Sequence, residues 1–268
     1  MRIWDIDPGY LNRQSLLGEH RELHAIFVVL TQNRKGYAAH PETRRWRNHL
    51  AALGKRHELL VEEMRLRGYR HHSPLPSTMG DTVWPQTFID PPHAQYAILR
   101  EKYRNREPGR IPLPASAREL WAQHKYSVLA RDPGLYRRIG PWLAAGDDSR
   151  RFRALARILV RTLRQPPPPG RLRNSLDHMW GYVSHLAGRG TAEHSQLLLL
   201  ASTRELAAAA GISYLLASTA LGEIGAWLGP PAEVDRAALM SSAAAILAGS
   251  RRPAVEMFTD GKEGGFQD

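Results

Sequence analysis

Apolar residues recur every three to four positions along most of the chain, which is the period of an amphipathic helix. In the first such stretch, residues 14–31, Leu16, Leu23 and Phe27 fall at this spacing, and Asn12 is placed to cap the start. Further helices are expected at about 41–53, 55–67, 93–104, 117–130, 133–145, 149–165, 172–187, 191–210, 213–228 and 232–248. No stretch alternates convincingly at the period of two that strands require, so the chain is predicted to be mainly α.

Proline and glycine divide this helical pattern. Residues 71–92 hold five prolines and are expected to be irregular, and PPPPG at 166–170 predicts a stiff connection. Residues 108–117 are expected to link two all-α helical domains, a compact one at 1–107 and a second at 118–250. Residues 251–268 are polar and are predicted to form a mobile tail.

The composition restricts the chemistry and the partners. Cysteine is absent, which excludes disulfides, thiolate nucleophiles and cysteine metal sites. The formal net charge is +11 and the pI is about 10.3, which favours a polyanionic partner, with nucleic acid as the first candidate. No apolar segment is long enough to suggest a membrane span or a secretion signal. A cytoplasmic protein without membrane contact or an obligate protein partner is therefore expected.

Basic residues gather in two places where they could contact phosphates. The first cluster consists of Arg44, Arg45, Arg47, Lys55 and Arg56, for which a solvated helix face is the alternative. The second lies between Arg150 and Arg173, a stretch with eight arginines and no acidic residue. Four of these arginines form a stripe at helical spacing: Arg153, Arg157, Arg161 and Arg164. The opposite face of that helix is apolar, so one face is expected to pack and the other to bind nucleic acid.

Histidines and aromatic residues give weaker signals. His20 and His24 lie four residues apart, a spacing used by metal ligands, but no HExxH motif accompanies them. We therefore expect packing or a phosphate contact there, with His20 among the nucleic-acid contacts, and no metal site. Aromatic residues that could stack on a displaced base are Trp4, Tyr37, Trp46 and Trp84, although each is more commonly a core residue.

Several short motifs follow one another in the first 105 residues. They are MRI at 1–3, Leu11, Gln14 and Leu16, EHREL at 19–23, RHELLVEEMRLRGY at 56–69, and a weaker match at 88–103. Together they resemble the phage endonuclease V type of pyrimidine-dimer DNA glycosylase, which is also an abasic-site lyase. The resemblance implies a compact helical domain that needs no metal or organic cofactor.

In that family the nucleophile is the α-amine of the chain itself, which attacks the sugar C1′ of the damaged nucleotide and leaves an imine before strand cleavage. The resemblance places this amine on Met1 and the assisting glutamate on Glu22, with Arg2 and Arg21 as basic neighbours. An α-amine suits the role because its ordinary pKa, near ~8, leaves a useful fraction neutral at pH 7. The phage enzyme exposes a threonine after its initiator methionine is removed, whereas the gapless register puts Met1 itself at that position.

A helical wheel places Gly18, Ala25 and Val29 on the same face as Glu22. Small residues on both sides of the carboxylate leave room for a sugar. Glu22 is therefore predicted to face a pocket into which the amino terminus folds back.

The second domain carries motifs of a different kind. LWAQHKYSVLARDPGLYRRIG at 120–140 and NSLDHMWGYVSHL at 174–186 resemble the YbgA-like family of uncharacterised helical domains. That resemblance implies a nucleic-acid module, with RNA as a candidate ligand. Asn174, His178 and Tyr182 share a helix face and are expected either to line a pocket or to join a buried polar network.

The chain is thus predicted to be a DNA repair glycosylase with abasic-site lyase activity, acting on a pyrimidine dimer or another lesion. Two alternatives stay open. One is an enzyme or binding protein that acts on modified bases in a structured RNA such as tRNA, and the other is a non-catalytic nucleic-acid-binding module. A metal hydrolase that uses His20 and His24 is a more distant alternative.

Overall fold

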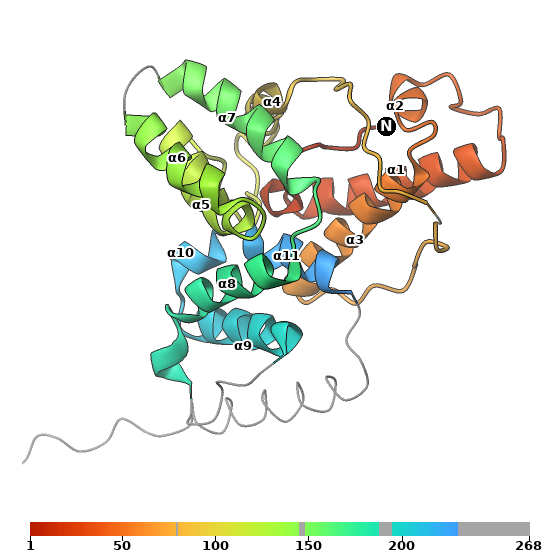
Figure 1. Cartoon of the computed structure of the whole chain (residues 1–268). Coiled ribbons are helices and arrows are strands. Elements are labelled where there is room, and N and C mark those ends of the chain that lie inside the picture. The colour runs from red at the N-terminus through yellow and green to blue at the C-terminus, as the bar shows by residue number, and fades with distance from the viewer. Residues whose placement is uncertain (79, 145–147, 188–194, 230–268) are drawn as a thin grey trace, which may run out of the picture.

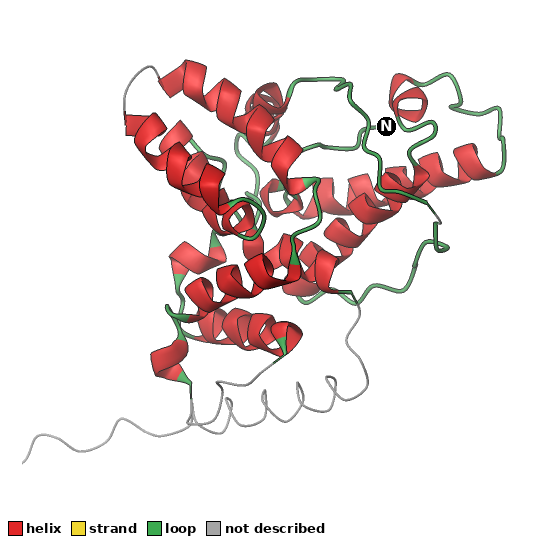
Figure 2. Ribbon diagram, viewed as in Figure 1, coloured by secondary structure: helices red, strands yellow, loops and turns green. Residues whose placement is uncertain are grey.

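The computed structural model describes residues 1–78, 80–144, 148–187 and 195–229, and all regular structure in these ranges is helical (Figure 2). The first part contains η1 (Pro8–Tyr10), α1 (Arg13–Thr31), α2 (Pro41–Arg45), α3 (Leu50–Leu66) and α4 (Pro92–Lys102). The second part contains α5 (Ala117–Leu129), α6 (Pro133–Ala144), α7 (Asp148–Leu163), α8 (Pro169–Trp180), η2 (Ser184–Leu186), α9 (Gln196–Ala209), α10 (Ser213–Leu216) and α11 (Ala220–Leu228). The prediction of a mainly α chain is confirmed. No helix in these ranges has the length and apolar character needed to cross a bilayer.

Helix α1 begins and ends where its sequence predicts. The Asn12 side chain accepts a hydrogen bond of 2.9 Å from the Ser15 N–H and so caps the helix. Leu16, Leu23 and Ile26 are fully buried along one stripe. The helix therefore gains most of its stability from packing this stripe into the core.

The next two helices differ from the sequence prediction. A break was expected near Gly54, but α2 ends at Arg45 and α3 runs unbroken through Gly54. The break comes instead at Asn48, which adopts a left-handed φ of 66°. Gly54 has a packing role, because a Cβ atom there would lie 3.0 Å from Thr78 Oγ1. Helix α3 ends before Gly68, whose φ of 78° fits the predicted C-terminal cap.

Two later predictions of single long helices were also wrong. The stretch 172–187 is divided into α8 and η2, and 213–228 is divided into α10 and α11. The helix predicted at 232–248 and the tail at 251–268 lie outside the described residues.

The second part of the chain packs directly on the first. Helices α1 and α3 lie side by side, α11 packs on α3, and α5 contacts α6, α7, α8 and α11 (Figure 1). One hydrophobic cluster joins buried residues of the first 111 positions to residues of α5, α6 and α7. A second cluster lies among α5, α8, α9, α10 and α11. Helix α7 thereby comes close to the first part of the chain.

The segment at 108–117 is free of helix until Ala117, as expected for a connection, but it is packed against the first part. Ile111 is fully buried, and its N–H donates a 2.9 Å hydrogen bond to the Gly9 carbonyl. Gly109 lies so close to the Tyr10 backbone that a Cβ atom would overlap it. The division into domains at these positions stays a prediction.

Candidate active site at the amino terminus

The first residues of the chain run extended along α1 and are held there by two glutamates. The Arg2 N–H donates a 2.5 Å hydrogen bond to Glu22 Oε2, and the Trp4 N–H donates one of 3.2 Å to Glu19 Oε1. Alternate N–H groups of an extended segment point to the same side, and residues three apart on a helix are neighbours. The amino terminus is therefore fixed beside the second turn and third turn of α1.

Met1 and Glu22 are brought together by this arrangement. Three covalent bonds separate the Met1 amine from the Arg2 nitrogen, so the amine lies within about 6 Å of Glu22 Oε2. Both residues are half-buried. A Cβ atom on Gly18, one turn before Glu22, would meet nothing within 4 Å, and Ala25 is exposed. Open space thus lies beside the carboxylate on the face that the helical wheel indicates.

Glu19 is a structural carboxylate that the sequence analysis missed. It is buried and accepts hydrogen bonds of 2.7 and 3.0 Å from Arg56, whose third nitrogen donates to the Ile6 carbonyl at 2.9 Å. Burial raises the pKa of Glu19, and the Arg56 charge opposes that rise. A signal was present in the sequence, because Glu19 falls on the same helix stripe as Leu16 and Leu23.

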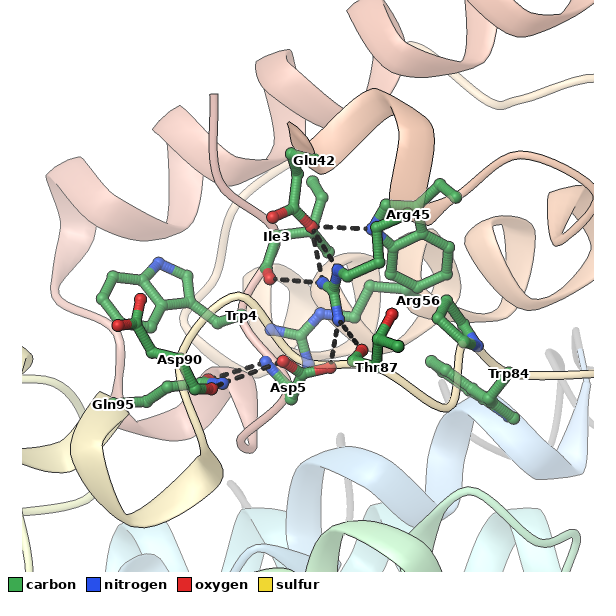
Figure 3. Close-up of polar contacts among 12 residues, drawn as sticks. Ile3, Trp4, Asp5, Glu42, Arg45, Arg56, Trp84, Thr87, Asp90 and Gln95 are labelled. Carbon is green, nitrogen blue, oxygen red and sulfur yellow. Dashed lines mark hydrogen bonds and ion pairs between the residues drawn. The ribbon is translucent and has the colours of Figure 1, made fainter. Parts of the chain in front are cut away.

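Arg45 holds the next stretch of the amino-terminal segment (Figure 3). Its buried guanidinium pairs with Glu42 and with Asp5 Oδ1, the latter at 2.8 Å, and donates to the Ile3 carbonyl at 3.0 Å. Asp5 also pairs with Arg164 at 2.5 Å. The sequence interpretation assigned Arg45, Arg56 and Arg164 to nucleic-acid binding. In the structure their guanidinium groups instead pair with carboxylates inside the protein and fix residues 3–6.

Other basic residues remain on the surface near the amino terminus. The Arg2 guanidinium pairs with Asp90 and lies 4.2 Å from the centre of the Trp4 ring. Three residues after Asp90, the pKa of His93 is lowered by burial and by the charges of Arg153 and Arg157. The exposed arginines of α7 therefore lie close to the start of α4, and Asp90, just before α4, contacts the amino-terminal segment by pairing with Arg2.

The remaining predicted nucleic-acid contacts are spread over the surface. Arg21, Arg44, Arg47 and Arg161 are exposed. Lys55 pairs with Glu58, donates to the Ala226 carbonyl at 2.9 Å and lies over the Trp227 ring, so it joins α3 to α11. His20 contacts other histidines, as described below. The exposed arginines among the predicted contacts thus lie on α1, on and just after α2, and on α7.

The predicted group in the second part lies on the surface. Asn174 and His178 are exposed on α8, and Tyr182 is exposed just after it. The Tyr182 ring is tilted against the Tyr214 ring, with centres 5.4 Å apart. Asn174 and His178 lie one turn apart on α8, whereas Tyr182 follows the end of the helix, so a shared role in binding stays a prediction.

Three of the four aromatic candidates belong to the core. Trp4, Trp46 and Trp84 are at most 8% exposed, whereas Tyr37 is 70% exposed. Tyr37 also has a left-handed φ of 59° and follows Arg34 and Lys35 in the loop between α1 and α2. Of the four, Tyr37 is therefore the one whose ring is exposed enough to stack on a base.

A partly open pocket lined by the amino-terminal segment is too small for a nucleotide. Its volume is about 40 Å³, and Trp4, Asp7, Tyr96 and His124 are among its lining residues. Since one water needs about 10–15 Å³ of such space, the pocket has room for a few water molecules and not for a nucleotide. A nucleotide would have to be engaged at the surface beside Met1 and Glu22.

Two known family models match parts of the chain. Residues 1–77 match the family model of pyrimidine dimer DNA glycosylases. The match contains Met1, Glu19 and Glu22, and it ends before the weaker motif at 88–103. It supports DNA glycosylase function and a DNA substrate for this part of the chain. Residues 125–221 match the model of a family of proteins of unknown function, DUF1722. Both resemblances seen in the sequence are thereby confirmed.

The two matches together leave the stretch between them, which includes Asp90 and α4, outside either family model. No curated protein and no solved structure matches the chain.

Proposed function

We propose that the protein is a DNA glycosylase with abasic-site lyase activity, and that it acts through an imine between the Met1 α-amine and the sugar C1′ of a damaged nucleotide. The observation that carries this proposal is the hydrogen bond from the Arg2 N–H to Glu22, which holds the chain's own amine beside a half-buried carboxylate. The family match of residues 1–77 supports the reaction class.

In the proposed reaction, the neutral Met1 amine attacks C1′ and the bond from C1′ to the base breaks, with the departing base taking a proton. Loss of the amine proton and opening of the sugar ring give the imine. The ring opening requires that the ring oxygen receive a proton. Glu22 is the group placed to carry these protons, because its carboxylate lies within about 6 Å of the amine. The imine then acidifies the adjacent C2′–H, β-elimination breaks the 3′ phosphate ester, and water hydrolyses the imine to restore the free amine.

The proposed binding surface surrounds this site. Arg21 on α1, Arg44 and Arg47 at α2, and Arg153, Arg157 and Arg161 on α7 are exposed and suited to phosphate contacts. Arg2 would exchange part of its pairing with Asp90 for a phosphate near the reacting sugar. C1′ is shielded in a stacked duplex, so the lesion must be displaced, and Tyr37 is the exposed aromatic residue proposed to stack during that step.

The second part of the chain is proposed to extend this surface through α7. Helix α7 lies within the stretch that matches the second family model, packs on α4 and α5, and presents arginines at every fourth position. In this view, residues 125–221 position α7 and add binding area, without contributing a reacting group.

The proposal can be tested by comparing the action of the protein on four nucleic acids. Untagged protein would be given a duplex with one pyrimidine dimer, a duplex with one abasic site, undamaged duplex and transfer RNA. Strand cleavage of the first two is expected, and in the dimer duplex the bond from C1′ to the base should break before the strand does. Cleavage of the abasic duplex alone would support the imine chemistry and indicate that the protein acts on a lesion other than the pyrimidine dimer. Action on transfer RNA alone, or binding without cleavage of any substrate, would overturn the proposal in favour of an RNA enzyme or a binding module.

A further inference from the structure

Four histidines from three parts of the chain converge on the side of α1 away from Glu22. His20 and His24 come from α1, His57 comes from α3, and His71 comes from the irregular segment after α3. One ring nitrogen of each lies within 4.8 Å of the corresponding nitrogens of the others. His57 is buried and the other three are half-buried, so the cluster is largely shielded from water.

The same atom of each ring points to the centre of the cluster. The Nε2 of His20 lies 3.2 Å from that of His57 and 3.0 Å from that of His71, and the Nε2 of His24 lies 3.3 Å from that of His57. The nitrogens therefore form a chain of three close contacts in the order His71, His20, His57, His24.

Hydrogen bonding alone does not satisfy this chain. The Nε2 of a neutral imidazole either carries one proton and donates or carries a lone pair and accepts. His20 and His57 each face two other Nε2 atoms. If both accept, their mutual contact has no proton, and if one donates, its single proton serves only one of its two contacts. At least one contact between ring nitrogens is left without a proper hydrogen bond in every tautomer.

A bound metal ion removes this conflict, because each ring then directs a lone pair at the cation. Zinc is held tetrahedrally by imidazole nitrogens at about 2.0–2.1 Å, which places neighbouring ligand atoms about 3.3–3.4 Å apart. The three close contacts, at 3.0–3.3 Å, are already near this spacing. The widest pair, at up to 4.8 Å, has to close by at most about 1.4 Å, which ring rotation can supply.

The protonation state of the rings is compatible with metal binding. Burial lowers the pKa of His20 to about 4 and that of His57 to about 3, with the neighbouring histidines as the second cause. The rings are therefore neutral near pH 7 and have lone pairs available for a metal.

We propose that His20, His24, His57 and His71 bind one divalent transition-metal ion of the zinc class and that this ion fastens the segment after α3 to α1 and α3. Glu22 lies about 160° around the α1 axis from both His20 and His24. The ion is thus a structural element on the far side of the helix, and the imine chemistry proposed for Met1 does not require it. Four protein ligands also leave no open position for substrate, as in structural zinc sites.

The test is a zinc titration of the untagged full-length protein after removal of metals with a chelator. Metal content would be followed in competition with a chromophoric chelator, and unfolding temperature would be measured with and without zinc. One zinc per chain is expected, with an increase of about 5–10 °C in unfolding temperature at a zinc concentration 100-fold above Kd.

The chain contains its own matched control, because His72 is exposed and follows His71 directly. His71→Ala is expected to weaken zinc binding at least 100-fold and to abolish the thermal shift. His72→Ala is expected to bind zinc as the parent does. Equal binding by the two variants, no tight site in the parent, or several weak equivalents would overturn the proposal.

A second measurement covers the case in which His71→Ala fails to fold. Cobalt(II) bound to the parent protein should show the intense visible absorption of a four-coordinate nitrogen site, which zinc then displaces. The weak absorption of a six-coordinate, hydrated ion would contradict the four-histidine site.

Discussion

At the scale of single residues, Glu19 and Glu22 have the same side chain and different tasks. Glu19 is buried and paired with Arg56, whereas Glu22 is half-buried beside open space. Glu22→Gln should keep the fold, because the amide oxygen still accepts the Arg2 N–H, and it should slow strand cleavage at least ~100-fold by removing a proton carrier. The measurement is single-turnover cleavage of abasic duplex, alongside urea unfolding.

Glu19→Gln is the matched comparison. It leaves Arg56 buried without its counter-charge and should lower the free energy of unfolding by about 3–5 kcal/mol. Equal loss of stability in the two variants, or full activity in Glu22→Gln, would contradict the assignment of roles.

The buried carboxyl of Asp7 should make the stability of the protein depend on pH. This carboxyl accepts the Gly9 N–H and lies near Glu63, Arg110 and Glu223. Burial, followed by the Glu63 charge, raises its pKa to about 7. Since the unfolded value is near ~3.9, the folded state binds more protons between pH 4 and 7. The stability that Asp7 contributes is therefore complete below pH 4 and is lost as pH rises through about 7.

The buried histidines oppose this trend, because their lowered pKa values make stability rise with pH in the acid range. The difference between the parent and Asp7→Asn isolates Asp7. Relative to the parent, the variant should gain stability by up to about 1.4 kcal/mol per pH unit between pH 4 and 7. Urea unfolding at several pH values checks this, and parallel curves for the two proteins would show that Asp7 is ionised in the folded protein.

At the scale of elements, α1 carries open space where a sugar would sit. Gly18→Ala should stabilise the protein by about 0.5–1 kcal/mol, because alanine favours the helix and the added Cβ meets nothing within 4 Å. Gly18→Trp should fill the space beside Glu22 and reduce cleavage at least ~10-fold while the unfolding temperature changes little. Gly140→Trp, at an equally open position on α6, is the control that should retain activity. Unchanged cleavage by Gly18→Trp would show that the sugar does not bind at this face of α1.

Helix α7 should act mainly through charge. Replacing Arg153, Arg157 and Arg161 with glutamine is expected to weaken duplex binding and to make the salt dependence of log K shallower by up to about 0.9 per lost phosphate contact. Binding isotherms at several salt concentrations measure the slope. Arg118→Gln, exposed on α5 beside Glu119, is the single-charge comparison. An unchanged slope in the triple variant would show that α7 faces away from the nucleic acid.

The helices were predictable because periodicity and caps are local signals. Asn12 and Gly68 mark helix ends from sequence alone, and the apolar stripe of α1 follows its period. The break at Asn48 was not predictable in this way, because Gly54 gives the stronger local signal and is overridden by packing against Thr78. Propensity therefore located the elements, and tertiary contacts decided their limits.

The candidate site was predictable only in part. Met1 and Glu22 follow from the resemblance, since their motif is local to the first 23 residues. The pairs of Arg2 with Asp90 and of Arg45 with Asp5 were not visible, because these contacts join residues 40 or more positions apart. The same holds for the four-histidine cluster: the spacing of His20 and His24 was visible, but His57 and His71 reach them only through the packing of α3 and the segment after it.

At the scale of the whole molecule, the chain joins a segment related to DNA glycosylases to one of unknown function through a shared core. Helices α5, α6 and α7 contribute to the same hydrophobic cluster as the amino-terminal segment, and α11 packs on α3. Arg164, at the end of α7, pairs with Asp5. The amino terminus is thus held in place by residues from both parts, which links the geometry of the proposed nucleophile to the integrity of the entire fold.

The most direct test of the central claim is borohydride trapping of the untagged protein on a duplex with one abasic site, followed by peptide mapping. Reduction of the imine should leave a covalent adduct on the Met1 α-amine, and the adduct should be lost in Glu22→Gln and after acetylation of the amino terminus. An adduct on a lysine, or no adduct despite tight binding of the duplex, would contradict the account.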